Sequence, residues 1–212
     1  MTAIDGVMFD LDGTLWDARQ ILATAWTEVL HAHGINEQLT VEKMSPLFGN
    51  ELSYVIRHSV SDDVSSADIN AVIPELTRVQ AQCVYDTLPA LYPGIQETFA
   101  ALSKHIPLMI VSNSVVGYIE AFLHGSKTGD YVTDYVCNGD TNLTKDKNIL
   151  LMKNRHHLCN PLYVGDTQMD GNASRSAGVK FAFASYGFGY TEDFDYRIYE
   201  LRDLIAIVEN QR

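Results

Sequence analysis

The sequence predicts an α/β fold, with a doubly wound, Rossmann-like parallel sheet core and an inserted all-helical cap domain. Short continuous apolar runs bounded by Gly, Asp, Ser and Asn are typical of buried parallel strands; they cover residues 7–9, 108–111, 162–164 and 181–184. Helical apolar spacing separates the runs, as in Ile95, Phe99 and Leu102, and a last helical pattern closes the chain with Ile198, Leu201, Ile205 and Val208. Strands and helices therefore alternate.

The segment between the first two runs has a different pattern. It contains no convincing strand run, and its apolar residues recur at helical spacing: Ile21, Ala25, Trp26 and Val29, then Val72, Leu76, Val79 and Cys83. A Gly-Thr turn precedes it, and Pro89 and the Pro93-Gly94 pair interrupt the chain after it. We therefore expect a catalytic core of residues 1–17 and 89–212 and a helical cap of residues 18–88.

Charge and composition restrict the partners. The 212 residues are 46% hydrophobic, enough for a full core, and the net charge of −12 disfavours nucleic acid and anionic membranes as partners. A small anionic substrate remains compatible if a metal or a local cation reverses the field in one cleft. The three cysteines suggest no disulfide framework, and the N-terminus resembles no signal peptide, so a cytoplasmic location is expected.

The first strand runs directly into two acids in the segment FDLDGTLWD, residues 9–17. Asp10 and Asp12 are two positions apart, a spacing that lets both reach one site at the end of the strand. Gly13 permits a sharp turn that exposes the Asp12 carbonyl, so a cation could take a carboxylate and a main-chain oxygen together.

Two further segments offer partners for a phosphate. Ser112 and Asn113 end the second run just before a helical pattern, where free amides and the positive helix end attract anions. Lys145, at the start of another predicted helix, supplies a cation, although Lys147 is a competitor two residues later.

A fourth segment, YVGDTQMDGNA at residues 163–173, adds two more acids. Asp166 follows a strand run, and Asp170 stands four residues later, a helical spacing that predicts both carboxylates on one face. Acids gathered near Asp10 would repel one another unless a divalent cation lay between them.

These four motifs, in this order, resemble the haloacid dehalogenase superfamily, and the inserted helices resemble the cap of its phosphoglycolate-phosphatase-like branch. The resemblance implies that Asp10 is the nucleophile that forms an aspartyl phosphate and that Asp12 is the general acid and base. It also implies Mg²⁺ on the Asp10 carboxylate, the Asp12 carbonyl and Asp166, with Asp170 binding the metal directly or through water. Ser112, Asn113 and Lys145 would bind the phosphate.

The resemblance therefore predicts a Mg²⁺-dependent phosphatase for a small phosphorylated metabolite, phosphoglycolate-like or a sugar phosphate. A phosphomutase of the β-phosphoglucomutase type is an alternative, but Leu22 stands where such mutases carry a histidine. Phosphonate hydrolysis would need a cap lysine, and the insertion offers only Lys43. A catalytically silent binding protein with this fold is the third possibility.

The cap must determine the substrate, because the core motifs handle only phosphate. Its loop Gly49-Asn50-Glu51 separates two helical patterns and is the candidate substrate loop, and Arg19 and Arg57 could meet a substrate carboxylate. The aromatic, glycine-rich run at residues 186–190 resembles a loop of the same branch. We expect a monomer or a homodimer.

Overall fold

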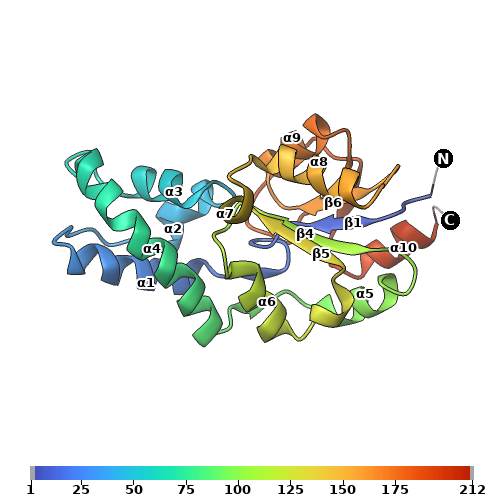
Figure 1. Ribbon diagram of the computed structural model, residues 1–212, viewed down its shortest axis with the longest axis horizontal. Coiled ribbons are helices and arrows are strands. Elements are labelled where there is room, and N and C mark those ends of the chain that lie inside the picture. The colour runs from blue at the N-terminus through green and yellow to red at the C-terminus, as the bar shows by residue number, and fades with distance from the viewer. Residues whose placement is uncertain (1–2, 211–212) are drawn as a thin grey trace.

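In the computed structural model, which describes residues 3–210, a six-stranded parallel sheet lies between two layers of helices, and the helices α1–α4 (residues 19–86) extend to one side of it (Figure 1). The strand order is β5-β4-β1-β6-β7-β8, which confirms the predicted doubly wound α/β fold. The strands are β1 (Val7–Phe9), β4 (Leu108–Ser112), β5 (Asp134–Cys137), β6 (Leu162–Gly165), β7 (Lys180–Ala184) and β8 (Tyr196–Ile198).

The order of the strands places the site. The chain runs from β1 to β4 and β5 on one side, and then crosses back to β6 on the other side of β1. Ligands of open α/β sheets bind at such a reversal, beyond the carboxyl ends of the strands. Asp10 is the first residue after β1, so it lies at this reversal.

Helices cover both faces of the sheet (Figure 1). One layer holds α8 (Lys145–Arg155) and α9 (Gln168–Ser176), and the other holds α5 (Ile95–Leu102), α6 (Tyr118–Ser126) and α10 (Asp203–Glu209). Successive residues of β1 alternate between two apolar clusters: Val7 and Phe9 belong to one, and Met8 to the other. Both faces are thus buried, as the continuous apolar runs predicted.

The inserted segment is helical. It contains α1 (Arg19–Ala32), α2 (Val41–Met44), α3 (Leu52–Ser59) and α4 (Ser66–Asp86), with the short 3-10 helix η1 (Ser45–Leu47). Its two ends meet where β2 (Trp16–Asp17) pairs antiparallel with β3 (Ala90–Leu91), a small ribbon that the sequence pattern did not reveal. The division into a core of 1–17 with 89–212 and a cap of 18–88 stays a proposal.

Some local predictions were wrong. Ile198 belongs to β8, so the last helix begins only at Asp203. Neither β5 nor β8 was predicted, because both are edge strands whose sequences, DYVC and YRI, mix polar with apolar residues. Within residues 3–210, no helix combines the length and the apolar character needed to cross a membrane.

Candidate active site

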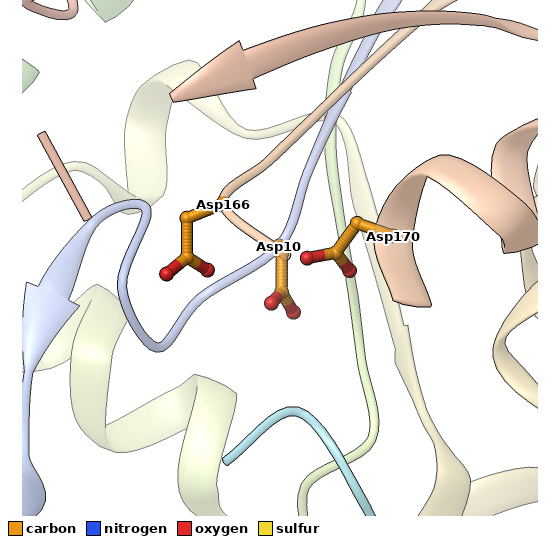
Figure 2. A group of neighbouring side chains, drawn as sticks. All are labelled: Asp10, Asp166 and Asp170. Atoms are coloured by element: carbon orange, nitrogen blue, oxygen red, sulfur yellow. The ribbon is translucent and has the colours of Figure 1, made fainter. Parts of the chain in front are cut away.

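Three buried carboxylates converge at the carboxyl end of the sheet (Figure 2). Asp10 follows β1, Asp166 follows β6, and Asp170 lies in the first turn of α9. One oxygen from each lies within 4.8 Å of the others, and all three residues are buried. The structure therefore brings together the acids that the first and fourth motifs supplied.

Lys145 lies between two of these acids. It is the first residue of α8, and its Nζ is 3.0 Å from Asp10 Oδ1 and 2.7 Å from Asp170 Oδ1. Burial opposes its charge, but the two carboxylates outweigh burial and raise the pKa of Lys145 above its ordinary value. Lys147 is exposed, so the geometry favours Lys145 over its competitor.

The aromatic, glycine-rich loop at residues 186–190 holds Asp166. In the sequence, this loop was recognisable only by its resemblance to one in the same family branch. Asp166 Oδ2 accepts hydrogen bonds from the backbone N–H groups of Phe188 (3.0 Å) and Gly189 (2.9 Å). A Cβ at Gly187 or Gly189 would lie within 2.4 Å of Asp166 or Gly13 atoms, so these positions require glycine for close approach. The paired glycines of the aromatic run are the signal that could have revealed this contact.

Both carboxylate oxygens of Asp170 are already engaged. Oδ1 accepts from Lys145, and Oδ2 accepts from the backbone N–H and the hydroxyl of Thr167, which caps α9. The helix begins at Gln168, so Asp166 precedes it, and the expectation that both acids share one helix face was wrong. The full set of partners on Asp170 suits a residue that orients Lys145 or a metal-bound water.

The acids fit a hard dication. Oδ1 of Asp166 is buried and has no hydrogen-bond partner among the described residues, which leaves an oxygen ready for a metal. Burial, followed by repulsion from Asp170 and Asp10, raises the pKa of Asp166 well above its ordinary value. Burial also raises the pKa of Asp10 to about 6, against the opposing charge of Lys145. An all-oxygen donor set of this charge matches Mg²⁺.

Asp12 lines the same cavity as Asp10, the candidate nucleophile. The Tyr118 hydroxyl, from α6, donates to Asp12 Oδ1 at 3.0 Å. Burial, followed by the charge of Asp10, raises the pKa of Asp12 to about 7. Gly13 turns the chain here with φ of 79° and packs directly against the Asp166 carboxylate. Asp12 is thus poised to exchange a proton near neutral pH.

Ser112 and Asn113 lie at the end of β4, beside the same site. Ser112 is buried, and its Oγ accepts from the Ser114 backbone N–H at 3.3 Å. The Asn113 side-chain amide donates to the Gly49 carbonyl of the cap at 2.7 Å. The helix α6 begins only at Tyr118, so the expected helix N-terminus directly after Asn113 was wrong. A loop follows Asn113 instead.

A cavity of about 30 Å³ lies between core and cap. A void of this size holds roughly one or two water molecules, so a phosphate ester needs a shift of the cap to enter. Gly49 and Asn50 of the candidate substrate loop line it. Glu51 lines a neighbouring open groove of about 740 Å³ instead, where it accepts from the Asn138 amide.

Aromatic rings connect the cap with the loop that holds Asp166. Phe48 of the cap stacks with Trp26 at 6.4 Å between ring centroids and contacts Phe188 edge-on at 5.6 Å. The Arg19 guanidinium lies 4.1 Å from the Phe188 ring centroid. The residue whose N–H group holds Asp166 therefore also packs against the cap.

The match to known proteins agrees with this geometry. The family model described as haloacid dehalogenase-like hydrolase matches residues 7–184. The chain is 28% identical over 195 residues to a phosphoglycolate phosphatase of Photobacterium profundum, covering 87% of this chain and 84% of that protein. It is 30% identical over 218 residues to a phosphoglycolate phosphatase of Nitrosospira multiformis, covering 97% and 91%.

A solved structure has the same fold. The haloacid dehalogenase-like family hydrolase from Streptococcus pneumoniae superposes with a TM-score of 0.84 at 21% identity, covering 98% of this chain and 99% of that one. The helical insertion is thus shared as well as the parallel sheet. The chain therefore belongs to the haloacid dehalogenase-like hydrolase family, in which it is a phosphatase related to the phosphoglycolate phosphatases.

Proposed function

We propose that this phosphatase is Mg²⁺-dependent and cleaves the ester of a small phosphorylated metabolite through an aspartyl phosphate on Asp10. The observation that carries the proposal is the convergence of Asp10, Asp166 and Asp170 on one point, with Lys145 between two of them. Such a group of buried charges is costly for folding, so a functional reason is expected for it.

The metal ligands would be the Asp10 carboxylate, the Asp12 carbonyl and the Asp166 carboxylate. The unpartnered Oδ1 of Asp166 supports this assignment. Asp170, whose oxygens are taken by Lys145 and Thr167, would act through water. When bound, Mg²⁺ would offset the repulsion between the Asp10 carboxylate and the phosphate dianion.

Asp10 would attack phosphorus through one carboxylate oxygen, and the bond from phosphorus to the ester oxygen would break. Its partner Lys145, 3.0 Å away, keeps a positive charge beside the reacting group. Ser112 and Asn113 add a hydroxyl and an amide at the neighbouring strand end. These donors would stabilise the charge that spreads over the transferring phosphoryl oxygens.

Asp12 would first donate its proton to the leaving alkoxide and then accept a proton from the water that cleaves the aspartyl phosphate. A residue serves both steps best when its pKa is near the working pH, and the pKa of Asp12 is raised to about 7. The hydroxyl of Tyr118 keeps the Asp12 carboxyl in place.

The substrate class is proposed from the relatives and the cap. Relatives are phosphoglycolate phosphatases, so a phosphoglycolate-like compound and a sugar phosphate are both candidates. Leu22 is buried and lines the cavity, which gives a mutase no histidine at that position. Lys43 contacts the Gln38 carbonyl and does not line the cavity, which disfavours Schiff-base chemistry.

The test is Mg²⁺-dependent release of p-nitrophenol from p-nitrophenyl phosphate by wild type and by Asp10→Asn. We expect the variant to lose at least ~10⁴-fold in kcat, because the amide is a poor nucleophile. Mass spectrometry of wild type quenched during turnover should detect phosphate on Asp10.

The matched control is Asp130→Asn, which makes the same change at an exposed residue and should retain wild-type activity. Undiminished turnover by Asp10→Asn would refute the proposal. A product assay with labelled β-glucose 1-phosphate separates hydrolysis from mutase activity, and a protein that turns over no phosphate ester would be the silent binding protein.

A further inference from the structure

Two cap residues that line the cavity have polar atoms that lack partners among residues 3–210. Gln80 in α4 and Trp26 in α1 both line the cavity together with Asp10. Gln80 is 6% exposed and Trp26 is 2% exposed, yet Gln80 Oε1 and Trp26 Nε1 have no hydrogen-bond partner. Buried polar groups are almost always paired, so these atoms are expected to pair with a molecule that enters the cavity.

A third unpartnered atom belongs to a core residue that lines the same cavity. Ser114 follows the two phosphate-binding candidates in the chain, is 7% exposed, and its Oγ lacks a partner among the described residues. The rest of the cap wall includes the apolar Leu22, Phe48 and Leu52 together with the polar Asn50. The lining residues of the cavity thus include an acceptor, a donor and a hydroxyl among apolar side chains.

The cap wall is also uncharged. Among the described residues that line the cavity, Lys145 is the only cationic side chain, and it is already paired with Asp10 and Asp170. A substrate carboxylate in this space would be buried without a free cation, which disfavours a second anionic group beside the phosphate.

Neither arginine considered from the sequence changes this result. Arg19 is held by Asp17 and Ser45 and covers Phe188, and it does not line the cavity. Arg57 donates to Asn70 and lines the neighbouring groove, which shares Asn50, Asn113 and Lys145 with the cavity. Neither arginine therefore lines the cavity itself.

We infer that the alcohol part of the substrate is short, uncharged and hydroxyl-bearing, with its hydroxyl donating to Gln80 Oε1 and accepting from the Trp26 indole N–H. This inference rests on the proposed phosphatase function and narrows it. It favours a neutral hydroxylated phosphate ester over a phosphorylated carboxylic acid, and so separates this chain from the substrate named for its relatives.

Wild type alone tests the inference with three esters of nearly equal size. They are 2-hydroxyethyl phosphate, ethyl phosphate, which lacks the hydroxyl, and 2-phosphoglycolate, which carries a carboxylate instead. We expect kcat/KM for 2-hydroxyethyl phosphate to exceed the other two values by at least about tenfold, because a site built to bond a hydroxyl rejects analogues without it.

Variants of the cavity residues test which side chains cause the preference for 2-hydroxyethyl phosphate. Gln80→Leu and Trp26→Phe should each reduce the ratio of kcat/KM between 2-hydroxyethyl and ethyl phosphate toward one. Gln80→Arg, which adds a cation to the wall, should raise the relative kcat/KM for 2-phosphoglycolate. The matched control is Gln82→Leu on the exposed side of the same helix, where the native side chain contacts Asp86, and its ratio should equal that of wild type.

The outcomes are distinct. A wild type that hydrolyses all three esters equally, or prefers 2-phosphoglycolate, overturns the inference and leaves the phosphatase proposal intact. A wild type that hydrolyses none of them, nor p-nitrophenyl phosphate with Mg²⁺, contradicts the proposed function itself. The wild-type comparison keeps its force even if a cap variant fails to fold.

Discussion

The two walls of the cavity differ in how their polar groups are satisfied. On the core wall, Lys145 joins Asp10 to Asp170, and backbone N–H groups hold Asp166. On the cap wall, none of the described lining residues is charged, and Gln80 and Trp26 have polar atoms without a partner among residues 3–210. The core wall is therefore a connected network of charges, whereas the cap wall is neutral and contains polar atoms without hydrogen-bond partners in the described part of the chain.

This difference corresponds to two separate tasks. A charged phosphate and a metal need groups fixed in advance, because reorganising buried charges during reaction raises the barrier. Recognition of a variable alcohol needs only a few polar atoms on an apolar surface. The predictions below therefore expect large losses of activity from the core wall and smaller, selective effects elsewhere.

The largest effect in this comparison should come from Lys145→Met. The change leaves Asp10 and Asp170 without their shared cation, so kcat should fall on the order of 10³-fold. The folded protein should also lose roughly 3–5 kcal/mol when metal-free, because buried charges are left unpaired. Steady-state kinetics and urea unfolding measure the two losses.

Lys147→Met is the control for this variant, since Lys147 is exposed and two residues away on the same helix. It should resemble wild type in both measurements. Equal losses in the two variants would mean that the charge network on the core wall has no special role.

The next effect concerns Mg²⁺ and pH. Burial raises the pKa of Asp10 to about 6, above the ordinary value of about 3.9, so ionising Asp10 destabilises the metal-free fold. This part of the stability is fully present below about pH 4 and is lost as pH rises through about 6. Mg²⁺ prefers the ionised acids, so its stabilisation should increase over the same range.

Thermal unfolding with and without Mg²⁺ at pH 5 and pH 7 measures this effect. We expect a shift in Tm that is larger at pH 7, by roughly 5 °C. Asp166→Asn should weaken Mg²⁺ binding on the order of 100-fold in calorimetry, while the exposed Asp130→Asn should not. A Mg²⁺ shift that is equal at both pH values would contradict the coupling of metal binding to these acids.

The smallest effect should come from Tyr118→Phe, which removes the hydroxyl that donates to Asp12. That hydrogen bond lowers the pKa of Asp12, so its loss should move the alkaline limb of the kcat/KM profile to higher pH, with activity reduced by about tenfold or less. Tyr135→Phe, whose native hydroxyl contacts Glu120, is the control and should leave the profile in place. If the pH profile of Tyr118→Phe matched that of wild type, the claim that the Tyr118 hydroxyl lowers the pKa of Asp12 would be contradicted.

The buried strands of the sheet centre could be predicted from local pattern. The apolar runs at 7–9, 108–111, 162–164 and 181–184 all became strands, because a strand covered on both faces must be apolar throughout. The edge strands β5 and β8 could not be predicted in this way, because each is paired with a neighbouring strand on one side only. Their polar residues give no continuous run.

The acids and the lysine of the candidate site were also visible in the sequence, because strand ends in an open α/β sheet are the expected place for charged residues. The hydrogen-bond partners of these site residues were not visible in the sequence. The loop at residues 186–190 reaches Asp166 across more than twenty positions of chain, and Gly49 reaches Asn113 across 64. Contacts at such separation depend on how the layers pack.

The sequence by itself determined which residues carry charge at the strand ends, since burial selects apolar runs and leaves acids and Lys145 only where function requires them. Only the tertiary structure decided that Gln80 and Trp26 share a cavity with Asp10, while Arg57 lies in the open groove. The reason is geometric: helical spacing predicts one buried face, but the packing of cap on core decides which residues of that face meet the substrate.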